Sequence, residues 1–243
     1  MKPLRQCDLT LSSPEENLAA DEVLLDLCEA GSAPPEGLLR FWEPAHYFVV
    51  VGYGNEVSRE VNLEFCQEHS IAVLRRCSGG GTVLQGPGCL NYSLILPVQP
   101  GSLESIPATN RFIMRRHQEA MTALLQARVE SKGYTDLAIG GLKFCGNAQR
   151  RRKYYVLFHG CFLLHADIGL MEKALRLPSR QPAYRANRSH TDFLVNLRLP
   201  AQIIKAALTK AWDASELMPT LPLEEIAQLA REKYAQPGWN AKF

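Results

Sequence analysis

The sequence predicts a mixed β-sheet packed against helices, for three reasons. Short strand-like segments alternate with amphipathic segments along the 243 residues. In the middle of the chain, the strand-like segments follow one another across short turns, which is typical of antiparallel pairs rather than of a doubly wound parallel sheet. No change in composition divides the chain. We therefore expect one domain over residues 1–243.

The first helix has the clearest start and stop signals. Ser13 is expected as its N-cap, and Glu16 completes a capping box. Gly31 is expected to end this helix. The next expected elements, in order, are strands at residues 38–42 and 47–51 around a turn, and a short helix capped by Asn62.

The rest of the chain continues the alternation of strands and helices. Expected strands cover residues 71–76, 82–84, 90–96, 142–149 and 154–167. Expected helices cover residues 111–129, 170–175, 201–212 and 223–234. Residues 177–191 show no periodic pattern, so we expect a long irregular segment there.

Charge, cysteine content and hydropathy limit the class of protein. The net charge of +2 at pH 7 is far from the strongly basic balance of a dedicated nucleic-acid-binding protein. Seven scattered cysteines without Cys-x-x-Cys spacing favour free thiols in a cytoplasmic protein over a disulfide framework or a zinc site. No apolar signal region or bilayer-length apolar run is present. We expect a cytoplasmic protein that binds neither nucleic acid nor a membrane.

Three consecutive glycines follow a predicted strand in Arg75-Arg76-Cys77-Ser78-Gly79-Gly80-Gly81-Thr82. A backbone without side chains can come close to an anionic group, and its N–H groups can form a concave anion site. The two arginines and Ser78 are expected at the entrance as hydrogen-bond donors. The spacing matches neither standard phosphate-binding loop, and a glycine-rich hairpin turn is the alternative.

A second stretch places a lysine near the start of a predicted strand. Lys143 is followed by Gly146, Asn147 and Ala148. A lysine in this position can direct its ammonium at a carboxylate or phosphate as a point charge. The alternative is an ordinary solvated lysine. The basic run at residues 150–153 is expected to be a solvated turn, with a nucleic-acid patch or an edge for an acidic protein partner as alternatives.

A third stretch has polar residues at alternate positions. In an extended strand, His159, Cys161, Leu163, His165 and Asp167 share one face. Four potential ligands in a straight row cannot surround an ion, so we expect no fixed metal site. Cysteine–histidine nucleophilic catalysis is an alternative. A polar strand face that lines a cleft is the simplest interpretation.

Four motifs, taken together and in order, resemble the catalytic domain of lipoate–protein ligases, within the wider biotin/lipoate ligase and octanoyltransferase family. These motifs are NLAADEVLL (residues 17–25), RRCSGGGTV (75–83), KFCGNAQR (143–150) and HGCFLLHAD (159–167). The resemblance covers nearly the whole chain. It implies an α+β fold, a mixed sheet packed with helices, related to the catalytic cores of class II tRNA synthetases.

The resemblance also implies a reaction. Ligases of this family use ATP and Mg²⁺ to convert lipoate or octanoate into an acyl-adenylate, and the acyl group then passes to a lysine of a lipoyl-acceptor domain protein. Lys143 would be the catalytic cation that stabilises the charge developing as pyrophosphate leaves. The other matching positions would bind the adenylate or form the cleft wall: Arg76, Ser78, Gly79, Gly80, Gly81, Thr82, Gly146, Asn147, Ala148, His159 and Asp167.

Three features depart from the ligase pattern. The Gly-Pro-Gly-x-Leu segment at residues 86–90 is more similar to octanoyltransferases, which move octanoate through a cysteine thioester. Cys145 and Cys161 lie near Lys143 in the sequence, which suggests thiolates with a lowered pKa and makes both candidate nucleophiles. We expect no C-terminal accessory domain of the kind that many ligases have, so a separate accessory subunit is an expected partner.

We therefore expect an ATP-dependent lipoate–protein ligase. The alternative is a cysteine-dependent octanoyl or lipoyl transferase that acts on an acyl-carrier protein or a lipoyl protein without ATP. Against this alternative, the Asn-Pro-Cys-Gly stretch that carries the transferase nucleophile is missing, and residues 177–191 contain no cysteine.

Overall fold

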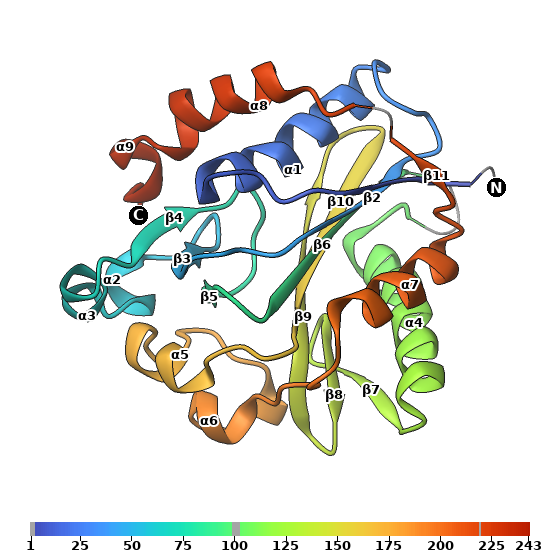
Figure 1. Ribbon diagram of the computed structural model, residues 1–243. Helices are drawn as coiled ribbons and strands as arrows, with labels where there is room; N and C mark the ends of the chain where they lie inside the picture. Colours follow the sequence, from blue (N-terminus) through green and yellow to red (C-terminus); the bar gives the residue numbers. More distant parts are fainter. Residues whose placement is uncertain (1–2, 99–102, 219) are drawn as a thin grey trace.

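Two β-sheets form the framework of the protein (Figure 1). The computed structural model describes residues 3–98, 103–218 and 220–243. Within these ranges, the larger sheet has the strand order β11-β1-β2-β6-β10-β9-β8-β7, and the smaller sheet has the order β4-β3-β5. The strands are β1 (Arg5–Asp8), β2 (Leu38–Trp42), β3 (Phe48–Val51), β4 (Ala72–Arg75), β5 (Val83–Gln85), β6 (Cys89–Pro97), β7 (Val129–Lys132), β8 (Asp136–Ile139), β9 (Leu142–Arg151), β10 (Tyr155–Leu163) and β11 (Glu216–Leu217).

The larger sheet is mixed, as the sequence predicts. Strands β2, β6, β10, β9, β8 and β7 pair antiparallel, whereas β1 pairs in parallel with both β2 and β11. The expected α+β class is therefore confirmed. The long central pair of β6 and β10 runs from Cys89 paired with Leu163 to Pro97 paired with Tyr155.

Helices cover both faces of the larger sheet (Figure 1). They are α1 (Pro14–Glu29), α2 (Val57–Glu60), α3 (Leu63–Glu68), α4 (Ile106–Leu125), α5 (Ile168–Ala174), α6 (His190–Phe193), α7 (Ala201–Trp212), α8 (Leu223–Leu229) and α9 (Pro237–Asn240), with a 3₁₀ turn at Ala183–Arg185 and a π-helical turn at Ala230–Tyr234. Within the described ranges, no helix is long and apolar enough to cross a membrane.

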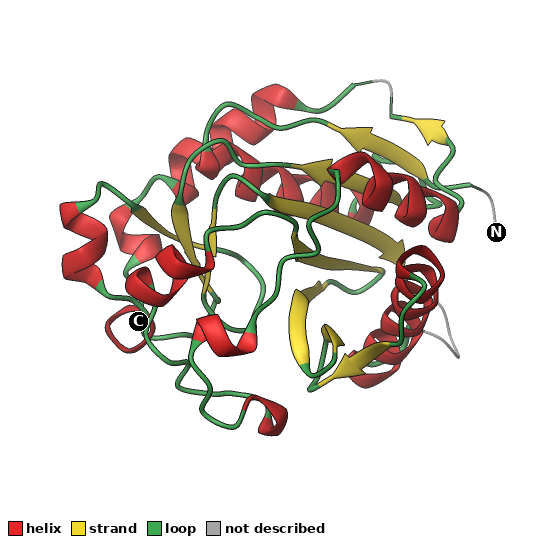
Figure 2. Ribbon diagram, turned by 60° about the horizontal axis from the view of Figure 1, so that its bottom comes forward, coloured by secondary structure: helices red, strands yellow, loops and turns green. Residues whose placement is uncertain are grey.

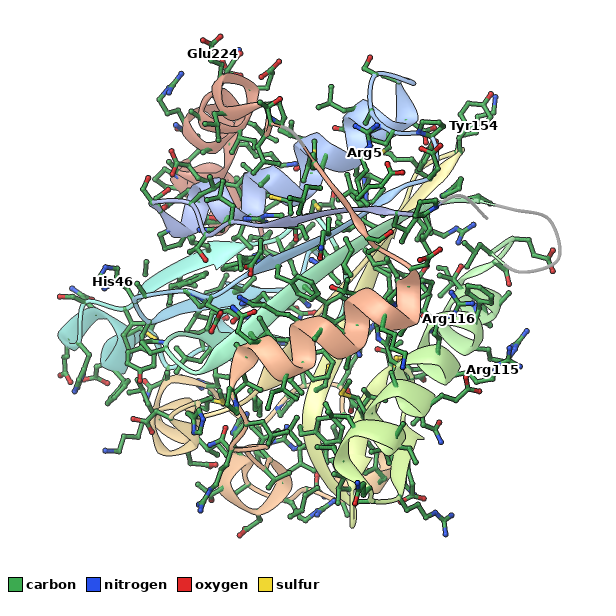
Figure 3. All side chains as sticks on the ribbon, turned by 45° about the vertical axis from the view of Figure 1, so that its right-hand side comes forward. Arg5, His46, Arg115, Arg116, Tyr154 and Glu224 are labelled. Atoms are coloured by element: carbon green, nitrogen blue, oxygen red, sulfur yellow. The ribbon has the colours of Figure 1, made fainter. Side chains whose placement is uncertain are left out.

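Helices α4 and α7 pack side by side on one face of the larger sheet. Ile113 and Met121 of α4 and Ile204 of α7 belong to the same buried cluster as the sheet residues on that face. Burial of each such side chain contributes roughly 1.5–3 kcal/mol. Arg116 lies at the contact between the two helices (Figure 3), and its Cζ is 4.7 Å from the centroid of the Trp212 ring.

Helix α1 lies on the other face and connects the two sheets. Leu18 packs in one cluster with Val50 of the smaller sheet and Ile226 of α8, and Leu24 packs in another cluster with Ile95 of the larger sheet. Because neighbours surround this helix, its apolar residues are not confined to a single stripe. The predicted start is confirmed, since Ser13 and Glu16 form the capping box.

The strands differ in three ways from the interpretations of the sequence. β2 and β3 do not form a hairpin, because β2 pairs with β1 and β6 in the larger sheet while β3 pairs with β4 and β5 in the smaller one. The glycines do not close a β4–β5 hairpin, because β3 lies between these strands. The strand expected at residues 154–167 ends at Leu163, since the next two N–H groups, of Leu164 and His165, donate to the carbonyl of Gly88.

The expected helix at 111–129 is also displaced. The helix is Ile106–Leu125, and the chain then forms the hairpin of β7 and β8, which the sequence analysis missed. After β10, the chain forms short helices joined by long loops (Figure 2). The segment predicted to be irregular, residues 177–191, lies in this part, and its helical residues are the 3₁₀ turn and the start of α6.

A buried ion pair joins α1 to the larger sheet. The Arg40 guanidinium has no exposed surface, and its Nη1 lies 2.9 Å from Oδ1 of Asp21. Nη2 of Arg40 donates to Oδ1 of Asn17 at 2.7 Å, and Ser93 donates to Asp21 at 2.6 Å. Burial opposes ionisation of Asp21, but the hydrogen bond from His159 and the charge of Arg40 outweigh it, so the pKa of Asp21 is below its ordinary value.

Asp21→Asn should lower the free energy of unfolding by roughly 3–5 kcal/mol at pH 7, because it leaves the buried charge of Arg40 unpaired. Since the pKa of Asp21 is lowered on folding, this contribution is fully present above the unfolded carboxyl pKa of about 3.9 and is lost as the pH falls through the folded value. The difference between the native protein and the variant should therefore shrink below about pH 4. Urea unfolding at several pH values measures it.

Ser93→Ala is the matched control, because it removes one neutral donor from the same carboxylate. We expect it to lower the free energy of unfolding by roughly 1.5–3 kcal/mol, the range for one hydrogen bond to a charged group. Equal losses in the two variants at pH 7 would show that the ion pair has no special role.

Candidate active site

A cavity of about 1010 Å³ opens beside the glycine segment, residues 78–82. Its walls come from α1, the glycine segment, β6, the β7–β8 turn, β9, β10 and the segment that follows α5. Most of the predicted site residues line it, namely Arg76, Gly80, Gly81, Thr82, Lys143, Gly146, Asn147, Ala148 and His159. Ser78 lies beneath this surface, fully buried. The fold therefore brings together in one cavity residues from three distant stretches of the sequence, those that begin at Arg75, Lys143 and His159.

Arg76 shapes the glycine segment from below. Its Nη2 donates to the carbonyls of Gly79 at 2.6 Å and Gly81 at 2.7 Å, its Nε donates to Ser78 Oγ at 3.0 Å, and its Nη1 donates to the carbonyl of Val50 at 3.3 Å. Burial lowers the pKa of Arg76 to about 10, so the guanidinium stays charged at neutral pH. As these hydrogen bonds show, each of the three guanidinium nitrogens of Arg76 already has a partner within the protein.

The glycine segment presents its own N–H groups. The N–H groups of Gly79, Gly80, Gly81 and Thr82 have no acceptor within the described part of the chain. Gly80 has φ +89°, a conformation that favours glycine, and a Cβ there would lie 3.0 Å from Nη2 of Arg76. The carbonyls turn toward Arg76 while the N–H groups stay unpaired, which is the arrangement of an anion-binding nest.

Arg75 is buried and structural, so the expectation that it stands at the entrance as a donor is wrong. Its Nη1 donates to the carbonyls of Gly52, Tyr53 and Asn55, at 2.9 to 3.0 Å. Its Nη2 donates to the carbonyl of Asn240 in α9 at 3.1 Å. This arginine fixes the C-terminal helix to the loop after β3.

A hydrogen-bonded chain runs from α1 to the glycine segment through His159. Asp21 Oδ2 lies 2.9 Å from Nδ1 of His159, and Nε2 of His159 lies 2.6 Å from Ser78 Oγ. In the neutral imidazole, the carboxylate acceptor beside Nδ1 fixes the proton on that nitrogen, and Nε2 then accepts from the Ser78 hydroxyl. The order resembles a Ser-His-Asp triad, but Ser78 has no exposed surface and already accepts from Arg76. These hydrogen bonds position the glycine segment, and they do not present Ser78 as a nucleophile.

Lys143 is held over the strand by a carboxylate. Its Nζ lies 2.8 Å from Oδ1 of Asp136, and Oδ2 of Asp136 accepts from the Tyr184 hydroxyl at 2.8 Å. A Cβ at position 146 would lie 2.5 Å from this Nζ, so Gly146 provides the room in which the ammonium lies. A shift in register between β8 and β9 pairs Asp136 with Gly146, which brings the carboxylate beside the ammonium.

The Asn147 carboxamide is enclosed by the protein. Its Oδ1 accepts from the Tyr92 hydroxyl at 2.6 Å, and its Nδ2 donates to the carbonyl of Thr135 at 2.7 Å. Gly160 is its cross-strand partner, and a Cβ there would lie 1.8 Å from Oδ1 of Asn147. Asn147 therefore braces the turn immediately before Asp136.

Neither candidate cysteine is activated, so the expectation of lowered pKa values is wrong. Cys145 has no exposed surface, and burial raises the pKa of its thiol far above the ordinary value, although the charge of Lys143 acts in the opposite direction. Cys161 is half-buried, and a hydrogen bond with Cys89 together with burial raises the pKa of the Cys161 thiol well above its ordinary value, while the same hydrogen bond lowers the pKa of the buried Cys89 thiol. Both candidate thiols line the cavity as neutral groups.

The expectation that Asp167 forms part of the cleft wall is also wrong. Because β10 ends at Leu163, the two-residue alternation does not reach His165 or Asp167. Asp167 is exposed and caps α5 by accepting from the N–H of Leu170 at 2.8 Å. Within the described ranges, no group of three His, Cys, Asp or Glu side chains is arranged to hold a metal ion.

Sequence reasoning missed Asp21, Asp136 and Tyr184, each of which holds a side chain of the site. Asp21 lies inside the first of the four motifs, where the sequence pattern does not distinguish it from any other polar residue of a helix. Asp136 stands seven residues before Lys143 in a hairpin that the sequence pattern did not reveal. No signal in the sequence connects Tyr184 with Asp136.

Comparisons with known proteins identify the family of the chain. Residues 13–211 match the family described as the Lipoyl protein ligase A/B catalytic domain. The chain is 29% identical to the octanoyltransferase LipM of Brevibacillus brevis, over 95% of each chain. It is 26% identical to the lipoate-protein ligase LplJ of Bacillus subtilis, over 95% of this chain and 71% of that protein.

The fold is also that of a solved structure. The structure of a bi-partite lipoate protein ligase from Thermoplasma acidophilum superimposes with a TM-score of 0.78 at 22% identity, covering 99% of this chain and 97% of that one. The match over residues 13–211 takes in the glycine segment, Lys143 and His159. The chain therefore belongs to the lipoyl protein ligase A/B catalytic domain family, whose members include lipoate–protein ligases and octanoyltransferases.

Proposed function

We propose that this protein is an ATP-dependent lipoate–protein ligase in which residues 1–243 act as a single catalytic domain. It would activate lipoate or octanoate with ATP and Mg²⁺ and transfer the acyl group to a lysine of a lipoyl-acceptor domain protein. The observation that carries the proposal is the cation of Lys143, held over Gly146 in the same cavity as the unpaired N–H groups of the glycine segment.

These groups suit the charges of an adenylation. A carboxylate oxygen of the acid attacks the α-phosphorus of ATP, and the bond to the leaving pyrophosphate breaks. A preorganised ammonium and N–H groups stabilise the negative charge that develops on the phosphate oxygens. The acceptor lysine then attacks the acyl carbon, AMP leaves with the bonding electrons, and the amine loses a proton. No step needs a nucleophile from the protein.

The cavity also has an apolar part that suits an acyl chain. Its lining includes the apolar side chains of Leu84, Leu163, Met171, Leu175 and Leu194. Each methylene transferred from water to such a surface contributes about 0.8 kcal/mol. A cavity with an apolar part and an oxyanion site matches an amphipathic acid better than it matches a nucleotide alone.

A cysteine-dependent transferase is the second candidate. It is favoured by the similarity to a protein named octanoyltransferase over nearly the whole length of both chains. The raised pKa values of Cys145 and Cys161 weigh against it, because the thiolate is the attacking species.

The Thermoplasma ligase, described as bi-partite and studied with its lipoyl domain, supports a lipoyl-acceptor domain and an accessory subunit as proposed partners.

The intact mass of a lipoyl-acceptor domain separates the two candidates. One reaction contains octanoate, ATP and Mg²⁺, and the other contains an octanoyl-carrier protein without ATP. A ligase adds the octanoyl mass only in the first reaction. Addition only in the second would replace the ligase with the transferase.

Lys143→Ala should lower the rate of acyl transfer at least about 100-fold, because it removes the cation from the reacting oxyanion. Cys145→Ser and Cys161→Ser should each retain most of the activity. Initial rates with saturating ATP measure both effects. A folded cysteine variant without activity, or near-normal turnover by Lys143→Ala, contradicts the proposed roles.

Gly146→Ala should lower turnover by about 100-fold while Lys143 is still present, because the new Cβ would displace its ammonium by an ångström or more. Gly238→Ala is the matched control, since a Cβ at this exposed position meets no atom within 4 Å. Equal rates in the two variants would mean that the position of the ammonium over β9 does not matter.

A further inference from the structure

The segment at residues 177–191 forms one wall of the cavity and is attached on two sides. Ser179 donates to the Glu60 carboxylate, and the Tyr184 hydroxyl donates to Asp136 at 2.8 Å. Arg188 also donates to the carbonyl of Gly141 at 3.1 Å. The segment is therefore held against the hairpin that carries Lys143. Its 3₁₀ turn, Ala183–Arg185, places Arg185 in the cavity wall.

Arg185 has an unsatisfied charged donor. The side chain is 5% exposed, its Nε donates to the carbonyl of Arg188 at 3.0 Å, and its Cζ lies 4.8 Å from the centroid of the Phe193 ring. Its Nη2 is buried without a hydrogen-bond partner within the described residues. An unsatisfied buried donor is unfavourable, and it is a common sign of a group that a ligand completes.

The acidic groups around Arg185 are engaged elsewhere. The Asp136 carboxylate binds Lys143 and the Tyr184 hydroxyl, and the Glu172 carboxylate accepts from the N–H groups of His190 and Thr191. His190 also lines the cavity, and burial lowers its pKa to about 4, so its imidazole is neutral at pH 7. The charge of Arg185 therefore has no hydrogen-bonded counterion in the described structure.

We infer that Arg185 is a substrate-binding residue whose guanidinium turns into the cavity and donates to an oxyanion, the carboxylate of the acyl substrate or a phosphate of the nucleotide. Arg185 would then act as a second cation together with Lys143. Unlike Lys143, which is already paired with Asp136, Arg185 gains its partner only when the anion is bound. The identity of the anion rests on the proposed function, whereas the unsatisfied donor does not.

Isothermal titration of the full chain with three separate probes tests this inference: octanoate, its neutral isostere octanamide, and ATP with Mg²⁺. Arg185→Gln should weaken binding of octanoate or of ATP about 10-fold or more, and leave octanamide unchanged. Arg185→Lys, which keeps the charge but loses the planar fork, should recover part of the loss. Arg176→Gln, which removes an exposed charge from the same part of the chain outside the cavity wall, should change none of the three.

The two anionic probes identify the source of the oxyanion, because a carboxylate site affects octanoate and a phosphate site affects ATP. Equal weakening of all three probes by Arg185→Gln would assign Arg185 a purely structural role and overturn the inference. Unchanged binding of both anions would overturn it as well. If the native protein binds neither octanoate nor ATP, the proposed ligase function is wrong. The inference is then overturned as well, because no oxyanion binds for Arg185 to contact.

Discussion

The ammonium of Lys143 lies in the cavity because β9 carries no side chain at Gly146. The space left by that missing Cβ receives Nζ, and the cross-strand partner Asp136 holds it there by an ion pair. Much of the surrounding structure fixes this small region. The shift in register between β8 and β9 aligns Asp136, Asn147 braces the turn before it, and Tyr184 occupies its second oxygen.

The buried arginines support this site by organising the backbone. Arg40 holds α1 through Asp21, Arg75 holds α9, and Arg76 draws the carbonyls of the glycine segment toward itself. In each case the guanidinium is hydrogen-bonded to groups of the protein; within the described residues, the one of these three side chains with an unpaired buried nitrogen is Arg40, at Nε, beneath helix α1. What Arg76 leaves available is the row of N–H groups on the glycine segment. The anion site is therefore made of backbone, and its charge comes from the lysine.

The sequence predicted the mixed sheet, the first helix with its capping box, and the meeting of three distant motifs in one cleft. These succeeded because local signals carry them: the Ser13 and Glu16 cap, the run of glycines, and the family pattern around Lys143. The pairing of β2 and β3 with different sheets could not be predicted, because it depends on which strands compete for each edge. The roles of Arg75 and Asp167 could not be predicted either, because they depend on hydrogen-bond partners in α9 and at the start of α5.

The central claim is that the cavity forms an acyl-adenylate, and exchange of labelled pyrophosphate into ATP tests it most directly. This exchange needs only the acid, ATP and Mg²⁺, so it reports the first half-reaction without any acceptor protein. The account predicts exchange that depends on octanoate or lipoate. Absence of such exchange, in a preparation that still transfers octanoyl groups from a thioester donor without ATP, would contradict it.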